Sequence, residues 1–267
     1  MNALAGWCTT RPDSLVPDRS RTVTREQVLQ AREILIERRD THLDSLVDKL
    51  REDRVRRVIE PILTGDVAFD PSFDDDFSYV RDLGIVTRQE GQVAIANPVY
   101  QEIIPRVLSL HVQMAIPDKP TWFVAADGTL DMARLIDGFI DFWRENGEVL
   151  QRGMPYHEAA PHLVFMAYLQ RVVNAGGRVV REFAIGTRRA DLVIDFGGRS
   201  EVIELKLTSA ARAKERGVEQ VSDYARRLGR DRGWLILFDP ASTHSWEERG
   251  RIEEVEREGV TVVVVWC

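Results

Sequence analysis

The chain has 267 residues, of which 44% are hydrophobic and 30% charged, and its formal net charge is -7. This length and composition are typical of a globular protein with two modules, and they exclude a disordered, fibrous or collagen-like chain. Apolar runs such as Val262 to Trp266 are far shorter than the about 20 residues that a membrane helix needs, so no membrane span is expected.

The cysteines and the N-terminus indicate the compartment. Cys8 and Cys267 are the only cysteines and stand near opposite ends of the chain, which predicts neither a disulfide framework nor a zinc cluster. The opening residues MNALAGWCTTRPDS lack the basic stretch and long apolar core of a secretory signal. We therefore expect a cytoplasmic protein.

A helical pattern runs from Thr24 to Leu63. Apolar residues recur there at steps of three and four, and Thr24 with Gln27 predicts a capping box at the start. Pro61 and Gly65 mark the end of the pattern.

Residues 66–111 predict a winged helix, with a helix at 77–83, strands at 85–88 and 93–96, and a further helix from residue 98. A winged helix that reads DNA normally presents a basic helix to the phosphates. Here the helix opens with Asp74, Asp75 and Asp76 and also contains Asp82, against a single Arg81. This acidity favours packing against a protein partner over reading DNA.

The C-terminal region predicts a mixed α/β sheet. A breaker-rich stretch at 114–129 and a helix at 130–146 precede it. The expected elements are helix 156–174, strands 179–184, 190–196 and 201–207, helix 215–228, strand 234–238, helix 246–258 and strand 260–266. The predicted domains are a helical and winged-helix module at 1–113, a linker with a connecting helix at 114–150, and an α/β domain at 151–267.

Three ionisable side chains are expected to converge on this sheet. Glu204 and Lys206 are two residues apart in one strand, so both point to the same face. Asp191 heads the neighbouring strand, which a short Gly-Gly turn connects, so its carboxylate is expected near Glu204. Two close carboxylates repel each other unless a cation lies between them, and Mg²⁺ or Mn²⁺ accepts carboxylate, water and phosphate oxygens together. A lysine beside such an ion can orient an attacking water, which points to hydrolysis of a phosphodiester.

Residues 156–238 resemble the PD-(D/E)XK nuclease superfamily, whose restriction-endonuclease-like core has the order α-βββ-α-β. Asp191 matches the family's aspartate, and Glu204-Leu205-Lys206 matches its (D/E)XK triplet. The resemblance implies that Asp191 and Glu204 bind the metal ion and that Lys206 is catalytic.

Further residues match additional positions of the same family. Glu158, early in the preceding helix, matches an acid that many members carry, which implies a supporting role in metal binding and catalysis. Gln220 and Tyr224 match a Q-x-x-x-Y helix that shapes the catalytic cleft, and they lie one helical turn apart on one face. A role of Glu158 as an ordinary first-turn acid and of Gln220 as a solvated helix residue stays open.

The remainder of the chain resembles the region that follows the nucleotide-binding core of prokaryotic AAA-type ATPases. RDTHLDSLVDKLREDRVRRVIEPILTG is similar to their helical lid, and DLGIVTRQEGQVAIANPVYQEII to their winged helix. No G-x-x-x-x-G-K-[ST] phosphate loop occurs in the chain, so ATP hydrolysis is not expected. The resemblance implies a shortened relative or a late start of such a protein.

We thus expect a metal-dependent nuclease that acts on DNA in preference to RNA. The stretch from 151 to 230 carries 14 Lys or Arg against 9 Asp or Glu, which suits a polyanionic partner. Two alternatives stay open. The first is an inactive nuclease fold that serves as an interaction or regulatory module, with Arg189 and Lys206 neutralising the acids in place of a metal. The second is a winged-helix transcription factor, which the acidic helix disfavours.

Overall fold

A computed structural model describes residues 22–24, 27, 31, 34, 41–64, 75–89, 92–115, 122–152, 154–181, 192–208, 212–239 and 249–267. The chain divides into two compact units, Met1–Asp53 and Arg54–Cys267. In the first unit the predicted capping box is confirmed, because Thr24 N donates to Gln27 Oε1 at 2.9 Å and Gln27 N to Thr24 Oγ1 at 3.3 Å. Helix α3 (Thr41–Lys49) follows, and the helical pattern is then interrupted by a turn at residues 50–52.

The second unit begins with helix α4 (Asp53–Thr64), which extends three residues beyond the Pro61 that was expected to end it. The predicted order helix, strand, strand, helix is present as α5 (Asp75–Asp82), the antiparallel pair β1 (Val86–Gln89) and β2 (Gln92–Ile95), and α6 (Pro98–Leu108). Asn97 caps α6 by accepting a hydrogen bond from Tyr100 N at 2.9 Å, and Pro98 is tolerated because the first helical position needs no donor. A short helix α7 (Leu110–Ala115) completes this part.

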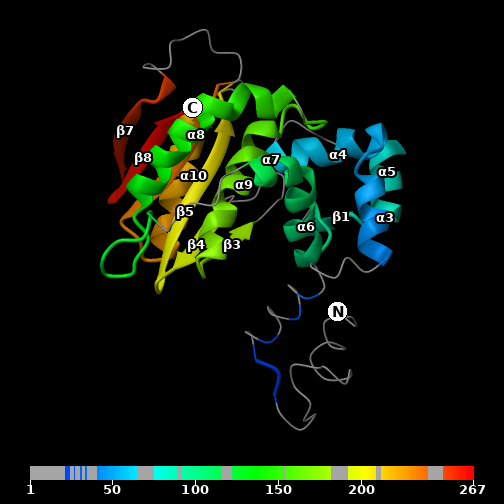
Figure 1. Cartoon of the computed structure of the whole chain (residues 1–267), viewed down its shortest axis with the longest axis horizontal. Helices are drawn as coiled ribbons and strands as arrows, with labels where there is room; N and C mark the ends of the chain where they lie inside the picture. Colours follow the sequence, from blue (N-terminus) through cyan, green and yellow to red (C-terminus); the bar gives the residue numbers. More distant parts are fainter. Residues whose placement is uncertain are drawn as a thin grey trace. The chain divides into compact units, whose positions relative to one another are not determined.

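The rest of the second unit contains a six-stranded mixed sheet and the helices that pack on it (Figure 1). Helices α8 (Met132–Arg152) and α9 (Ala160–Asn174) precede its strands. The strand order is β3-β4-β5-β6-β8-β7, and β5, β6 and β8 run parallel to one another. The elements are β3 (Arg178–Arg181), β4 (Leu192–Phe196), β5 (Arg199–Leu207), α10 (Ala213–Arg227), β6 (Arg232–Phe238), β7 (Ile252–Arg257) and β8 (Val260–Trp266).

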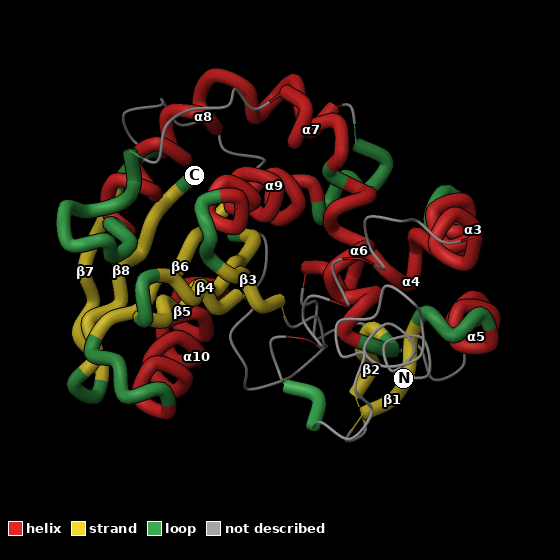
Figure 2. The backbone as a smooth tube through the Cα atoms, turned by 60° about the horizontal axis from the view of Figure 1, so that its bottom comes forward, coloured by secondary structure: helices red, strands yellow, loops and turns green. Residues whose placement is uncertain are grey.

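Helices cover both faces of the sheet, which gives a layered α/β arrangement (Figure 2). On one face, α10 packs Val218 and Val221 against Leu235 and Leu237 of β6 and against valines of β8. On the other face, the ring of Phe238 contacts aromatic rings of α8 and α9, namely Phe139, Trp143, His162 and Phe165. The apolar strands β6 and β8 are therefore buried from both sides, as their continuous apolar runs predict.

The expected order of helix, three strands, helix and strand is observed as α9, β3, β4, β5, α10 and β6. The predicted Gly-Gly hairpin between β4 and β5 is also present, because Gly197 and Gly198 have φ values of 55° and 77° and a two-residue turn of this kind requires positive φ. The mixed α/β class is thus confirmed.

The predicted helix at 246–258 is wrong, because residues 252–257 form the edge strand β7. β7 pairs antiparallel with β8 through a tight turn at Glu258 and Gly259, whose φ values of 52° and 79° favour a hairpin. The sequence IEEVER is rich in charges that suit either an exposed helix or an edge strand. Pairing with the buried β8 decides the outcome.

Within the part of the chain that the structure describes, no helix combines the length and apolarity required to cross a bilayer.

Candidate functional site

The site is built on the end of the central strand β5. Lys206 Nζ lies 2.6 Å from Glu204 Oε1, so the two side chains share one face of the strand, as predicted. The register places Glu204 beside Leu235 and Lys206 beside Leu237, which pack against α10. Neighbouring residues of a sheet point to the same side, so Glu204 and Lys206 lie on the face that α10 covers.

The ion pair is withdrawn from water. The side chain of Glu204 is 0% exposed and that of Lys206 is 15% exposed. A carboxylate without hydration needs a cationic or hydrogen-bonding partner, and the ammonium of Lys206 supplies one. The neutralisation of Glu204 by Lys206, which the sequence left open, is therefore part of this structure.

Asp191 lies outside the described residues, so its convergence with Glu204 stays a prediction. The described strand β4 begins at Leu192, which pairs with Ile203 of β5. Arg189, the alternative neutralising residue, falls in the same undescribed stretch.

Glu158 differs from Glu204 in exposure and in the element that carries it. It is exposed and lies in the turn that leads into α9, and its backbone N–H donates to Glu60 Oε1 at 2.7 Å. Among the described residues, no three His, Cys, Asp or Glu side chains gather closely enough to hold a metal ion. Glu158 and Glu204 therefore do not form a three-ligand group with a described third acid.

Gln220 and Tyr224 lie on α10, the helix that covers the face of Glu204 and Lys206. Both side chains are half-buried and stand one turn apart beside the buried stripe of this helix. The structure thus places both residues on the helix that follows β5, as expected, whereas their role in a cleft stays a prediction.

Helix α4 holds the start of α9 through contacts that the sequence did not reveal. Glu60 Oε1 accepts from Glu158 N and, at 3.3 Å, from Ala159 N, and Arg56 Nη1 donates to the Pro155 carbonyl at 3.3 Å. His162 Nδ1 lies 3.1 Å from the Leu63 carbonyl oxygen. His162 is buried among these contacts, and its ring packs on Phe238.

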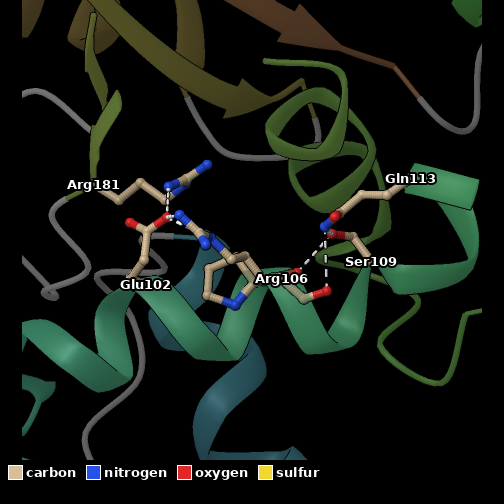
Figure 3. A network of polar contacts seen from close by, with 6 residues as sticks. Glu102, Arg106, Ser109, Gln113 and Arg181 are labelled. Atoms are coloured by element: carbon tan, nitrogen blue, oxygen red, sulfur yellow. Dashed lines mark hydrogen bonds and ion pairs between the residues drawn. The ribbon is translucent and has the colours of Figure 1, made fainter. Parts of the chain in front are cut away.

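A second link joins α6 to β3 (Figure 3). Glu102 Oε1 accepts from Arg181 Nη1 at 2.6 Å and from Arg106 Nε at 2.7 Å. Close by, Gln113 of α7 donates to Ser109 Oγ at 3.1 Å, which ties α7 to the end of α6. A sequence signal for the first network exists, since Glu102 and Arg106 are four residues apart in the otherwise apolar helix PVYQEIIPRVL. Its partner Arg181 is 79 residues away and carries no such signal.

The acidic helix α5 is partly neutralised from within the second unit. Asp76 lies 3.2 Å from Arg54 Nε and 2.5 Å from Arg57 Nη2, both on α4. Part of the acidity that disfavours DNA reading is therefore used for packing inside the chain.

Burial raises the pKa of two other ionisable groups, Glu201 and Cys267. Burial raises the pKa of Glu201 on β5, although the indole N–H of Trp234 donates to this carboxylate at 3.3 Å and nearby arginines act in the opposite direction. Burial also raises the pKa of the Cys267 thiol, which keeps it protonated and makes it unsuitable as a nucleophile or a metal ligand.

Comparison of the chain with protein-family models, with curated proteins and with solved structures finds no match to any of them. The functional argument therefore rests on the residues and on their arrangement.

Proposed function

We propose that the protein hydrolyses phosphodiester bonds of nucleic acid, with DNA preferred to RNA, in a metal-dependent reaction at the end of β5. The observation that carries the proposal is the pair of Glu204 and Lys206, a buried carboxylate and an ammonium 2.6 Å apart on a central strand. Their position supports it, because open α/β sheets bind ligands beyond the carboxyl ends of their parallel strands. The order α9-β3-β4-β5-α10-β6 agrees with the PD-(D/E)XK resemblance.

The proposal requires Asp191 to stand opposite Glu204. Leu192 pairs with Ile203 in an antiparallel ladder. If the ladder continues by one pair, the Cα atoms of Asp191 and Glu204 are about 4.5 to 5.5 Å apart and their side chains share one face.

The residues of this chain would divide the work as follows. Asp191 and Glu204 offer the hard oxygen ligands that Mg²⁺ or Mn²⁺ prefers, and Glu158 assists through a water. The bound ion would supply Lewis-acid chemistry and charge neutralisation at the phosphate. Lys206 orients the attacking water or offsets the charge that develops on the phosphate oxygens, and Gln220 shapes the site.

The test is cleavage of plasmid DNA, single-stranded DNA and RNA by the purified protein with Mg²⁺, with Mn²⁺ and with a chelator. We expect cleavage with either metal and none with the chelator. Asp191→Asn, Glu204→Gln and Lys206→Met are each expected to lower the rate on the order of 100-fold or more. Glu201→Gln, three residues before Glu204 on the same strand, is the matched control and keeps the rate. Variants as active as the wild type would exclude this site.

The second candidate function is that of an interaction module built on an inactive nuclease fold. The observation that favours it is that Lys206 already neutralises Glu204, so that a metal is not required for charge balance. A folded wild-type protein that is inert on all three substrates with both metals would select this function. The proposal in either form includes a cytoplasmic setting and a distant relation to the C-terminal regions of AAA-type ATPases, on the resemblance already described.

A further inference from the structure

The segment of the second unit from residue 54 to residue 115, here called the helical module, packs on α9 through α6 and α7, and two of its carboxylates bind elements of the α/β part. On α4, Glu60 accepts from the backbone N–H groups of Glu158 and Ala159, just before α9. On α6, Glu102 pairs with Arg181, the last residue of β3. One contact thus lies beside Glu158 itself, and the other holds the strand that leads into residues 182–191.

The contact of Glu60 does the work of a capping residue from another helix. The first backbone N–H groups of a helix lack partners within it, and a nearby side chain usually accepts from them. The local sequence PYHEAA before α9 offers no Ser, Thr, Asp or Asn at this place. A carboxylate located 98 residues earlier fills the role.

Among the described residues, Glu102 forms a buried ionic network with Arg181 and Arg106 (Figure 3). The side chains of Arg181 and Glu102 are 2% and 5% exposed, and that of Arg106 is 20% exposed. Charges lose their hydration when buried, and apolar side chains of similar size often replace such a network without loss of stability. What apolar side chains do not reproduce is the fixed geometry of a guanidinium on a carboxylate, which restricts direction as well as distance.

We propose that Glu102 is a positioning residue, which through Arg106 and Arg181 fixes one alignment of the helical module on the sheet. Glu60 provides a second fixed point, so that rotation about the first is blocked. The alignment holds β3 and the turn that carries Glu158. Its consequence for catalysis rests on the proposed function, whereas the alignment itself does not.

The alignment is measured by the distance between two spin labels in the full chain. The labels are attached at Asp82→Cys in the helical module and Arg227→Cys on α10, both at exposed positions, with Cys8 replaced by Ser and Cys267 by Ala. In the otherwise unchanged chain we expect one narrow distance distribution. In the variant Glu102→Met/Arg106→Met/Arg181→Met we expect a folded protein whose distribution is at least twofold wider.

Two further variants keep the result interpretable. Arg144→Met removes an exposed ion pair with Asp141 on α8 and is expected to leave the distribution unchanged. Arg181→Lys keeps the charge but loses the guanidinium, and we expect intermediate broadening even if the triple variant does not fold. A distribution in Arg181→Lys or in the folded triple variant that is as narrow as that of the parent chain would overturn the proposal.

Cleavage kinetics provide the functional readout. If the protein is a nuclease, Arg181→Lys is expected to lower kcat about tenfold with little change in KM, because Arg181 positions the end of β3 and is not itself among the proposed substrate contacts. If the wild type is inert, the proposed function fails, and the spin-label distances still decide whether Glu102 sets the alignment.

Discussion

Replacement of Lys206 by Met tests whether Glu204 and Lys206 form a buried ion pair on which the fold depends. The Glu204 side chain is 0% exposed and that of Lys206 15% exposed, so removal of the ammonium takes a cationic partner away from a carboxylate that water does not reach. Breaking a buried pair in this way costs about 3 to 5 kcal/mol, and the small exposure of Lys206 favours the lower end. At about 2 to 4 °C per kcal/mol, a loss of about 3 kcal/mol lowers Tm by about 6 to 12 °C.

The assay is thermal and urea unfolding of Lys206→Met, Glu204→Leu and the double variant at neutral pH. The double variant removes both charges and is expected to lie within about 1 kcal/mol of the wild type, because an apolar pair carries no desolvation cost. A Lys206→Met protein as stable as the wild type would refute the buried pair.

The same variant also reports on the proposed metal site. A divalent ion that binds Glu204 only in the folded state stabilises it by about 2.7 kcal/mol at 100 times its dissociation constant. We therefore expect Mn²⁺ to recover much of the stability that Lys206→Met loses, and to have no such effect on the variant Glu204→Leu/Lys206→Met. Equal responses of the two variants to Mn²⁺ would argue against Glu204 as a ligand.

Three further predictions follow from other contacts. Burial raises the folded-state pKa of Glu201, so ionisation of this carboxyl destabilises the folded protein as pH rises above the ordinary glutamate value. Glu201→Gln should therefore raise Tm at pH 7, and the gain in Tm should shrink to zero below about pH 4. A gain in Tm that does not depend on pH would contradict this reasoning. Glu60→Ala should cost about 1 kcal/mol in urea unfolding and speed amide exchange at Glu158, whereas Glu60→Gln keeps an acceptor and most of the stability. Phe139→Ala, which removes a fully buried ring, should cost about 3 to 5 kcal/mol, while Val149→Ala on the exposed side of the same helix should change stability by less than about 0.5 kcal/mol.

The part of the candidate site that lies within one strand could be predicted from the sequence. Alternation in β5 is sufficient to place Glu204 and Lys206 on one face, and their ion pair confirms it. The contribution of Asp191 stays a prediction, because it lies outside the described residues. The contact of Glu60 with the turn before α9 could not be predicted, because a carboxylate that accepts from a backbone N–H 98 residues away leaves no pattern in its local sequence.

The sequence by itself determined the elements whose periodicity is local. The apolar runs of β6 and β8, the Gly197-Gly198 turn and the capping box of Thr24 each follow from side-chain pattern or backbone preference. Only the tertiary structure decided what depends on a distant partner. The charged segment 252–257 forms a strand because it pairs with the backbone of β8. Glu102 is buried because Arg181 of β3 neutralises its carboxylate. A local sequence encodes which conformations are accessible to it, whereas the partner that satisfies its hydrogen bonds and charges selects one of them.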